Sequence, residues 1–113
     1  MQTAIVVTWT HPFPGREEKA LAFGAEVTEF WGKKAAEGKC TEPEIFFSER
    51  GTGFWFIKGD RDTLLQIHDT EEARLLTLKG DLLLENFSVD FFYADEAAAD
   101  YMTRYASALT AIK

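Results

Sequence analysis

The chain has 113 residues, and 19 Asp and Glu against 12 Lys and Arg give it a formal net charge of −7. A surface that follows nucleic-acid phosphates needs clustered basic side chains, so this charge balance argues against a nucleic-acid partner. A single cysteine excludes an internal disulfide framework and a cysteine-built zinc site.

The sequence also lacks the signals of a membrane or exported protein. No apolar run approaches the 18 residues that a membrane span needs. The N-terminal segment MQTAIVVTWTHP has neither a basic start nor a cleavable apolar region. We therefore expect a cytoplasmic protein with no membrane partner, folded as a single domain over residues 1–113.

The first half of the chain predicts a strand, a long helix and a hairpin. Residues 4–10 (AIVVTWT) are β-branched and aromatic, which favours a strand. Over 16–38, apolar residues recur at helical spacing, with acidic side chains first and lysines last. Residues 44–48 and 53–58 flank a glycine-bearing turn and predict two antiparallel strands.

The second half predicts two helices, a strand and a terminal helix. A short helix is expected over 63–68, and Asp69 followed by Glu72 predicts a capping box that opens a helix over 71–84. A last strand covers 87–93, and an amphipathic helix begins at Asp95. The order β-α-β-β-α-β with an antiparallel sheet and a C-terminal helix is the ferredoxin-like arrangement of the α+β class.

Alternation along the predicted strands sorts their side chains onto two faces of the sheet. One set is almost wholly apolar and is expected to carry the helices: Ile5, Val7, Trp9, Ile45, Phe47, Phe54, Phe56, Phe87, Val89 and Phe91. The other set is mixed: Val6, Thr8, Thr10, Phe46, Ser48, Trp55, Ile57, Ser88, Asp90 and Phe92.

The mixed face carries too much apolar surface to stay bare. Phe46, Trp55 and Phe92 represent on the order of 500 Å² of apolar surface, the size of the largest patch that a typical monomer exposes. Either a second copy packs sheet against sheet and encloses a cavity, or the C-terminal helix folds across the face in a monomer. The polar residues of this face favour the partly hydrated cavity of a homodimer.

In that homodimer the mixed face would line a cavity for an apolar or aromatic small molecule. The expected ligand-binding residues are Thr8, Thr10, Phe46, Ser48, Trp55, Ile57, Ser88 and Phe92. The aromatic members also fit a purely structural role in the dimer interface.

Asp90 and His11 are the candidate catalytic residues. Asp90 lies among apolar residues, where a carboxyl group acts as an acid or base at neutral pH. The alternatives are an ion pair with the partner protomer or an edge-strand charge that discourages aggregation. His11 precedes Pro12 at the mouth of the first strand and fits either a general base or an exposed loop histidine.

The remaining reactive side chains give weaker indications. His68 next to Asp69 is explained equally well by a favourable interaction with a helix C-terminus. The two histidines lack the spacing of a metal motif, and no cofactor-binding motif is present, so we expect neither metal nor cofactor. Cys40 has no evident base partner in the sequence.

The segments AIVVTWT, PGREE, GFWFIKGDRDTLLQIHDTEEARLLTL and FSVDFFY together resemble the dimeric α+β barrel superfamily. Its members share this element order and pair two sheets into a barrel. They include haem-degrading monooxygenases, cofactor-free quinone-forming monooxygenases, isomerases and stress-responsive proteins. PGREE before a long helix is most similar to an uncharacterised bacterial group that resembles stress-responsive and antibiotic-biosynthesis-monooxygenase-like proteins.

The haem-degrading pattern does not fit. It requires Asn on the first strand, Trp after the third strand and a ligating His in the second long helix. This sequence has no Asn on the first strand, Lys58 near the second position and Thr77 near the third. The resemblance therefore implies a small-molecule-binding homodimer of unknown function. The alternatives are a cofactor-free monooxygenase or isomerase for an aromatic or quinone-like substrate, and a structural interaction module.

Overall fold

A computed structural model describes residues 2–112 of the chain. Its centre is a four-stranded antiparallel sheet in the order β2-β3-β1-β4. The strands are β1 (Thr3–Trp9), β2 (Glu44–Phe47), β3 (Gly53–Gly59) and β4 (Ser88–Tyr93). All four lie where the sequence predicts strands.

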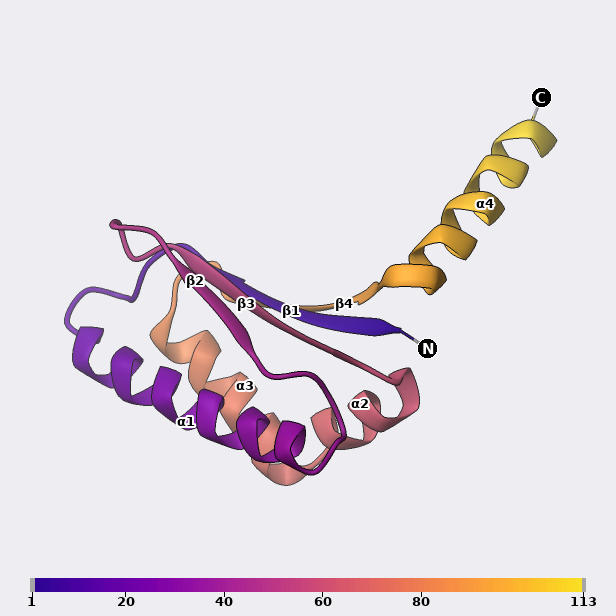
Figure 1. Ribbon diagram of the computed structural model, residues 1–113. Helices are drawn as coiled ribbons and strands as arrows, with labels where there is room; N and C mark the ends of the chain where they lie inside the picture. The colour runs from indigo at the N-terminus through magenta and orange to yellow at the C-terminus, as the bar shows by residue number, and fades with distance from the viewer. Residues whose placement is uncertain (1, 113) are drawn as a thin grey trace.

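Three helices cover one face of this sheet, as Figure 1 shows: α1 (Glu17–Ala36), α2 (Arg61–His68) and α3 (Glu71–Leu83). A fourth helix, α4 (Asp95–Ala111), follows β4. The predicted ferredoxin-like α+β arrangement with an additional C-terminal helix is confirmed.

Side-chain hydrogen bonds cap the N-terminal ends of both α2 and α3. The Asp60 carboxylate accepts a hydrogen bond of 3.2 Å from the backbone N–H of Thr63 at the start of α2. The Thr70 hydroxyl accepts one of 3.3 Å from Ala73 N–H and caps α3. The predicted capping box at Asp69 is wrong, because Asp69 still has helical backbone angles as the C-cap of α2.

The pairing register decides which side chains face the helices. Ile5 pairs with Ile57, Val7 with Trp55, and Val7 also with Val89, so odd-numbered strand residues share the helix-covered face. Phe46 pairs with Phe54, and the even-numbered residues share the other side. We call this other side the open face; it consists of Ala4, Val6, Thr8, Glu44, Phe46, Phe54, Phe56, Lys58, Ser88, Asp90 and Phe92.

The faces predicted for β1, β2 and β4 are correct, but those predicted for β3 are reversed. Trp55 and Ile57 belong to the helix-covered core and are only 8% and 0% exposed. Phe54 and Phe56 lie on the open face instead. The reversal arises because both sides of GFWFIK are apolar, so the pattern holds no information about the phase of this strand.

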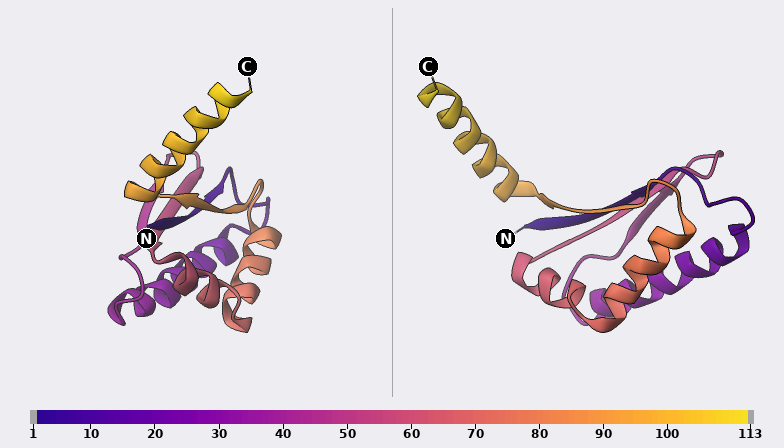
Figure 2. Two further views of the ribbon diagram at one scale, coloured as in Figure 1. Left: turned by 90° about the vertical axis from the view of Figure 1, so that its right-hand side faces the viewer. Right: turned by 180° about the vertical axis from the view of Figure 1, so that it is seen from behind.

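Neither the three helices α1, α2 and α3 nor the terminal helix α4 covers the open face. Figure 2 shows α4 projecting away from the end of the sheet, on the side opposite α1, α2 and α3. Phe46, Phe54 and Phe92 are 46%, 42% and 52% exposed. The expected alternative in which the terminal helix forms a third layer over the sheet is therefore wrong for this structure. Within residues 2–112, no helix is long and apolar enough to cross a membrane.

Candidate functional site

A large hollow lies on the helix side of the sheet, between α1 and the edge strand β2. We call it the α1–β2 groove; its volume is about 780 Å³. Leu21, Gly24 and Thr28 of α1 form one wall. The sheet supplies the other wall and the floor with Trp9, Ile45, Phe47 and Trp55. The groove exists because the helices cover β1, β3 and β4 but leave the helix side of β2 exposed.

Aromatic contacts hold the floor of the groove in place. The Trp9 indole N–H donates a hydrogen bond of 2.9 Å to the carbonyl oxygen of Gly51. The Trp9 ring meets Phe47 edge-on, with 5.7 Å between ring centroids. Gly53 lies beneath Trp9, and a Cβ atom there would come within 2.7 Å of the indole. The Trp9 ring is therefore fixed before any ligand arrives.

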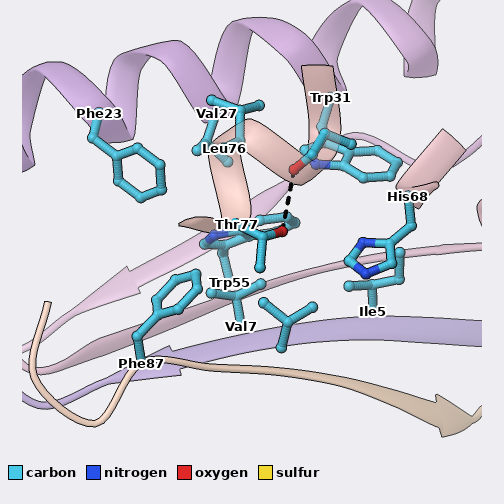
Figure 3. Close-up of a pocket in the computed structure, with 12 residues that line it drawn as sticks. Ile5, Val7, Phe23, Val27, Trp31, Trp55, His68, Leu76, Thr77 and Phe87 are labelled. Carbon is cyan, nitrogen blue, oxygen red and sulfur yellow. Dashed lines mark hydrogen bonds between the residues drawn. The ribbon is translucent and has the colours of Figure 1, made fainter. Parts of the chain in front are cut away.

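A small inner pocket adjoins the groove deeper in the core. It has a volume of about 30 Å³ and shares Val7, Phe23, Val27, Trp55 and Phe87 with the groove lining. Figure 3 shows that Trp31, His68 and Thr77 lie around it. This volume is enough for one or two water molecules rather than for a ligand.

Two polar side chains, those of His68 and Thr77, line the inner pocket among mainly apolar neighbours. The half-buried His68 ring packs edge-on against Phe91, with 5.4 Å between centroids. The Thr77 hydroxyl donates a hydrogen bond of 3.1 Å to the Ala73 carbonyl oxygen, drawn as a dashed line in Figure 3. The Thr77 oxygen can still accept a hydrogen bond from a water molecule or a ligand group.

The ionisable side chains of the groove lining are both acidic. Glu17 and Glu29 of α1 lie along it, and both are exposed to solvent. Carboxylates at the rim repel anions, so the groove favours a neutral or cationic molecule over an anionic one.

The predicted ligand residues divide into three groups. Thr8, Phe46, Ser88 and Phe92 lie on the open face, as predicted. Trp55 and Ile57 lie in the core on the opposite side, and Trp55 lines the groove.

Thr10 and Ser48 form the third group, because their hydroxyls take part in connections at the strand ends. The Thr10 hydroxyl donates to the Glu85 carbonyl oxygen at 3.1 Å and accepts from Asn86 Nδ2 at 3.0 Å. The Ser48 hydroxyl accepts a hydrogen bond of 3.3 Å from Arg50 N–H in the β2–β3 turn.

The two candidate catalytic residues lie apart from each other in the fold. Asp90 is exposed on the open face, and the Ser88 hydroxyl donates a hydrogen bond to its carboxylate. His11 is exposed in the β1–α1 loop, next to Pro12, which lines the groove. Of these two residues, only His11 adjoins the α1–β2 groove.

Sequence reasoning missed His68, Trp31 and Thr77 as pocket residues. The signal for His68 was its position four residues after Leu64, which puts the imidazole on the buried side of a short amphipathic helix. Trp31 lies four residues after the buried Val27 in the same way. No sequence signal distinguished Thr77 from the other residues of α3.

No other group of reactive side chains forms a site in the part of the chain that the structure describes. Residues 2–112 contain no cluster of three His, Cys, Asp or Glu side chains that could hold a metal ion. Burial, and to a smaller extent the nearby Glu42 carboxylate, raises the pKa of the Cys40 thiol. A raised pKa keeps this thiol neutral and unreactive at neutral pH.

Comparison with known proteins supports the fold and leaves the function open. No protein-family model matches the sequence, and no curated protein is similar to it in sequence. The Rv0793 protein of Mycobacterium tuberculosis has a similar solved structure, with a TM-score of 0.67 and 18% identity over 86% of this chain and 99% of that one.

Two further solved structures are similar to this chain in fold. A dimeric protein of unknown function and ferredoxin-like fold from Bacteroides fragilis matches with a TM-score of 0.58 and 10% identity, over 82% of this chain and 96% of that one. An antibiotic biosynthesis monooxygenase matches with a TM-score of 0.59 and 22% identity, over 84% of this chain and 99% of that one. At these identities the likeness confirms the predicted ferredoxin-like α+β fold and nothing finer.

Proposed function

We propose that this protein binds a flat, apolar or aromatic small molecule in the α1–β2 groove and acts as a homodimer formed through the open face. The observation that carries the binding proposal is the groove itself. Its volume of about 780 Å³ lies within the range of about 300–1,000 Å³ typical of ligand sites. Two indoles, three phenyl rings and Leu21 line it, with few polar groups to fix orientation.

The proposal moves the ligand from the open face, where the sequence suggested it, to the helix side. Three of the five aromatic residues that line the groove lie on the sheet: Trp9, Phe47 and Trp55. Flat aromatic surfaces favour offset stacking with a planar ligand. The open face is then available for the contact between protomers, which the exposed Phe46, Phe54 and Phe92 support.

Gly24 offers a way to test the binding site. It lines the groove, and a Cβ atom at this position meets no other atom within 4 Å. Gly24→Phe therefore fills the groove without a clash at Cβ and replaces a helix-weakening residue. Gly32→Phe is the matched control, because Gly32 lies in the same helix, has the same free space and does not line the groove.

The probe is N-phenyl-1-naphthylamine, an uncharged aromatic amine that fluoresces in apolar surroundings. We expect the wild-type protein and Gly32→Phe to bind it with affinities within twofold of each other. Gly24→Phe should bind at least tenfold more weakly. Equal affinities in both variants would show that the probe does not bind in the groove. Absence of probe binding by the wild type would contradict the proposed small-molecule binding.

A second candidate function is catalysis by a cofactor-free monooxygenase or isomerase that acts on an aromatic or quinone-like substrate. The description of one structural neighbour as an antibiotic biosynthesis monooxygenase favours it. If the substrate lies in the groove, His11 next to Pro12 is the nearer candidate base. If it lies between two open faces, Asp90 is the nearer one. Oxygen uptake with phenols, measured for His11→Gln and Asp90→Asn, distinguishes the two positions.

A further inference from the structure

Helix α4 is a long helix that contacts its own chain only near its base, within the residues that the structure describes. None of the residues Asp95–Ala111 is buried. Figures 1 and 2 show that the helix extends away from the sheet, on the open-face side and past the ends of the strands. An isolated helix of about this length is marginal in water, so α4 requires a surface that buries one of its sides.

The sequence of α4 shows which side needs burial. Five large apolar residues recur at helical spacing and form what we call the α4 stripe: Tyr101, Met102, Tyr105, Leu109 and Ile112. Their exposed fractions range from 50% to 78%. Asp100, Thr103 and Ser107 lie on the opposite side of the helix, and that side suits solvent.

The base of α4 is fixed to the sheet. The Lys58 ammonium nitrogen lies 3.3 Å from a carboxylate oxygen of Asp95. The rings of Tyr93 and Tyr101 stack with 4.5 Å between centroids. These contacts join the first two turns of α4 to β3 and β4, so they direct the helix past the end of the sheet on the open-face side.

Surface area indicates what occupies that space. The exposed parts of Phe46, Phe54 and Phe92 provide about 300 Å², well below the roughly 800 Å² per protomer of a standard interface. The α4 stripe adds on the order of 500 Å² on a helix that projects on the open-face side of the sheet. Together the two apolar surfaces reach the size that a stable dimer needs.

We propose that α4 is an exchanged arm, whose stripe packs on a second copy of this chain seated on the open face. The proposal rests on the homodimer of the proposed function and specifies how that dimer is completed. A two-fold interface places the same surfaces on both protomers, so each chain gives one arm and receives one.

The direct test uses dimers that pair one ¹³C-labelled protomer with one unlabelled protomer. Filtered nuclear Overhauser spectra then report contacts between chains. We expect contacts from the methyl groups of Met102, Leu109 and Ile112 to protons of the unlabelled protomer. Contacts confined to the labelled chain would mean that α4 folds back on its own sheet. Absence of any contact would mean that the stripe serves no second copy, and both results overturn the exchange.

Charged variants give an independent test in the full-length chain. Leu109→Glu places a carboxylate in the stripe, whereas Ser107→Glu places one on the opposite side of the same helix. We expect Leu109→Glu to raise the dimer dissociation constant at least tenfold, and Ser107→Glu to change it by less than twofold, by sedimentation equilibrium. Equal effects would overturn the exchanged arm. A wild-type protein that stays monomeric would instead contradict the homodimer, and probe binding in the groove is measured separately.

Discussion

Gly80 shows how one residue without a side chain shapes the pocket. A Cβ atom at this buried position in α3 would lie 2.3–2.7 Å from three ring carbons of Phe87. Phe87 lines both the inner pocket and the α1–β2 groove. In the sequence Gly80 only weakens the helix pattern, but in the structure it lets an aromatic ring pack directly against the α3 backbone.

We expect Gly80→Ala to destabilise the protein by about 1 kcal/mol. Displacing Phe87 costs roughly 1–3 kcal/mol, and the better helix propensity of Ala returns only about 1 kcal/mol. Gly24→Ala is the control, because its Cβ meets nothing within 4 Å, and it should stabilise by about 0.5–1 kcal/mol. Urea unfolding measures the free energy of unfolding of both variants. An increase in this free energy for both would show that the Phe87 ring moves aside without an energetic cost.

At the level of elements, the order and approximate bounds of all eight helices and strands were predictable. Local signals are strong there: β-branched runs mark the strands, and apolar spacing marks the helices. The faces of β1, β2 and β4 also followed from alternation. In β3, Trp55 and Ile57 alternate with Phe54 and Phe56, and only the pairing with β1 and β2 decides which pair is buried.

The α1–β2 groove was not predictable in the same way. It depends on how far α1 lies from β2 across the sheet, which the sequence of neither element states. Ile45 and Phe47 were correctly assigned to the helix side, yet they are 38% and 68% exposed because no helix reaches them. The candidate site is therefore a product of packing between elements that are distant in sequence.

Helix α3 allows a prediction about which leucines hold it to the core. Leu76 is 7% exposed and Leu78 is 62% exposed, although both fit the apolar spacing of the sequence. Leu76→Ala should lower the free energy of unfolding by about 2–4 kcal/mol, because it leaves a cavity in the core. Leu78→Ala should change it by less than about 0.5 kcal/mol. Thermal or urea unfolding compares the two, and similar losses would contradict the orientation of α3.

At the scale of the whole molecule, charge opposes the association that the apolar surfaces favour. Each chain has a formal net charge of −7, so two protomers in the proposed homodimer repel each other. Salt screens this repulsion over a Debye length of about 10 Å at 0.1 M. We expect the dimer dissociation constant to fall when sodium chloride rises from about 20 mM to about 300 mM.

Sedimentation equilibrium at the two salt concentrations checks this expectation. A dissociation constant that rises with salt would instead indicate ion pairs between the protomers. Asp90 on the open face is then the first residue to examine, because an ion pair is one of the roles that its sequence position allows. Asp90→Asn should abolish the salt dependence in that case.

The open side of the groove has a consequence for the speed of ligand exchange. Leu21 and Phe47 at its walls are 75% and 68% exposed, so a molecule reaches the indole floor within one protomer without any opening of the backbone. Entry is then limited by diffusion, and residence time depends only on the strength of the contacts within the groove. For the proposed ligand, this geometry allows release without any movement of the backbone, which suits a sensor or transient carrier better than a long-term store.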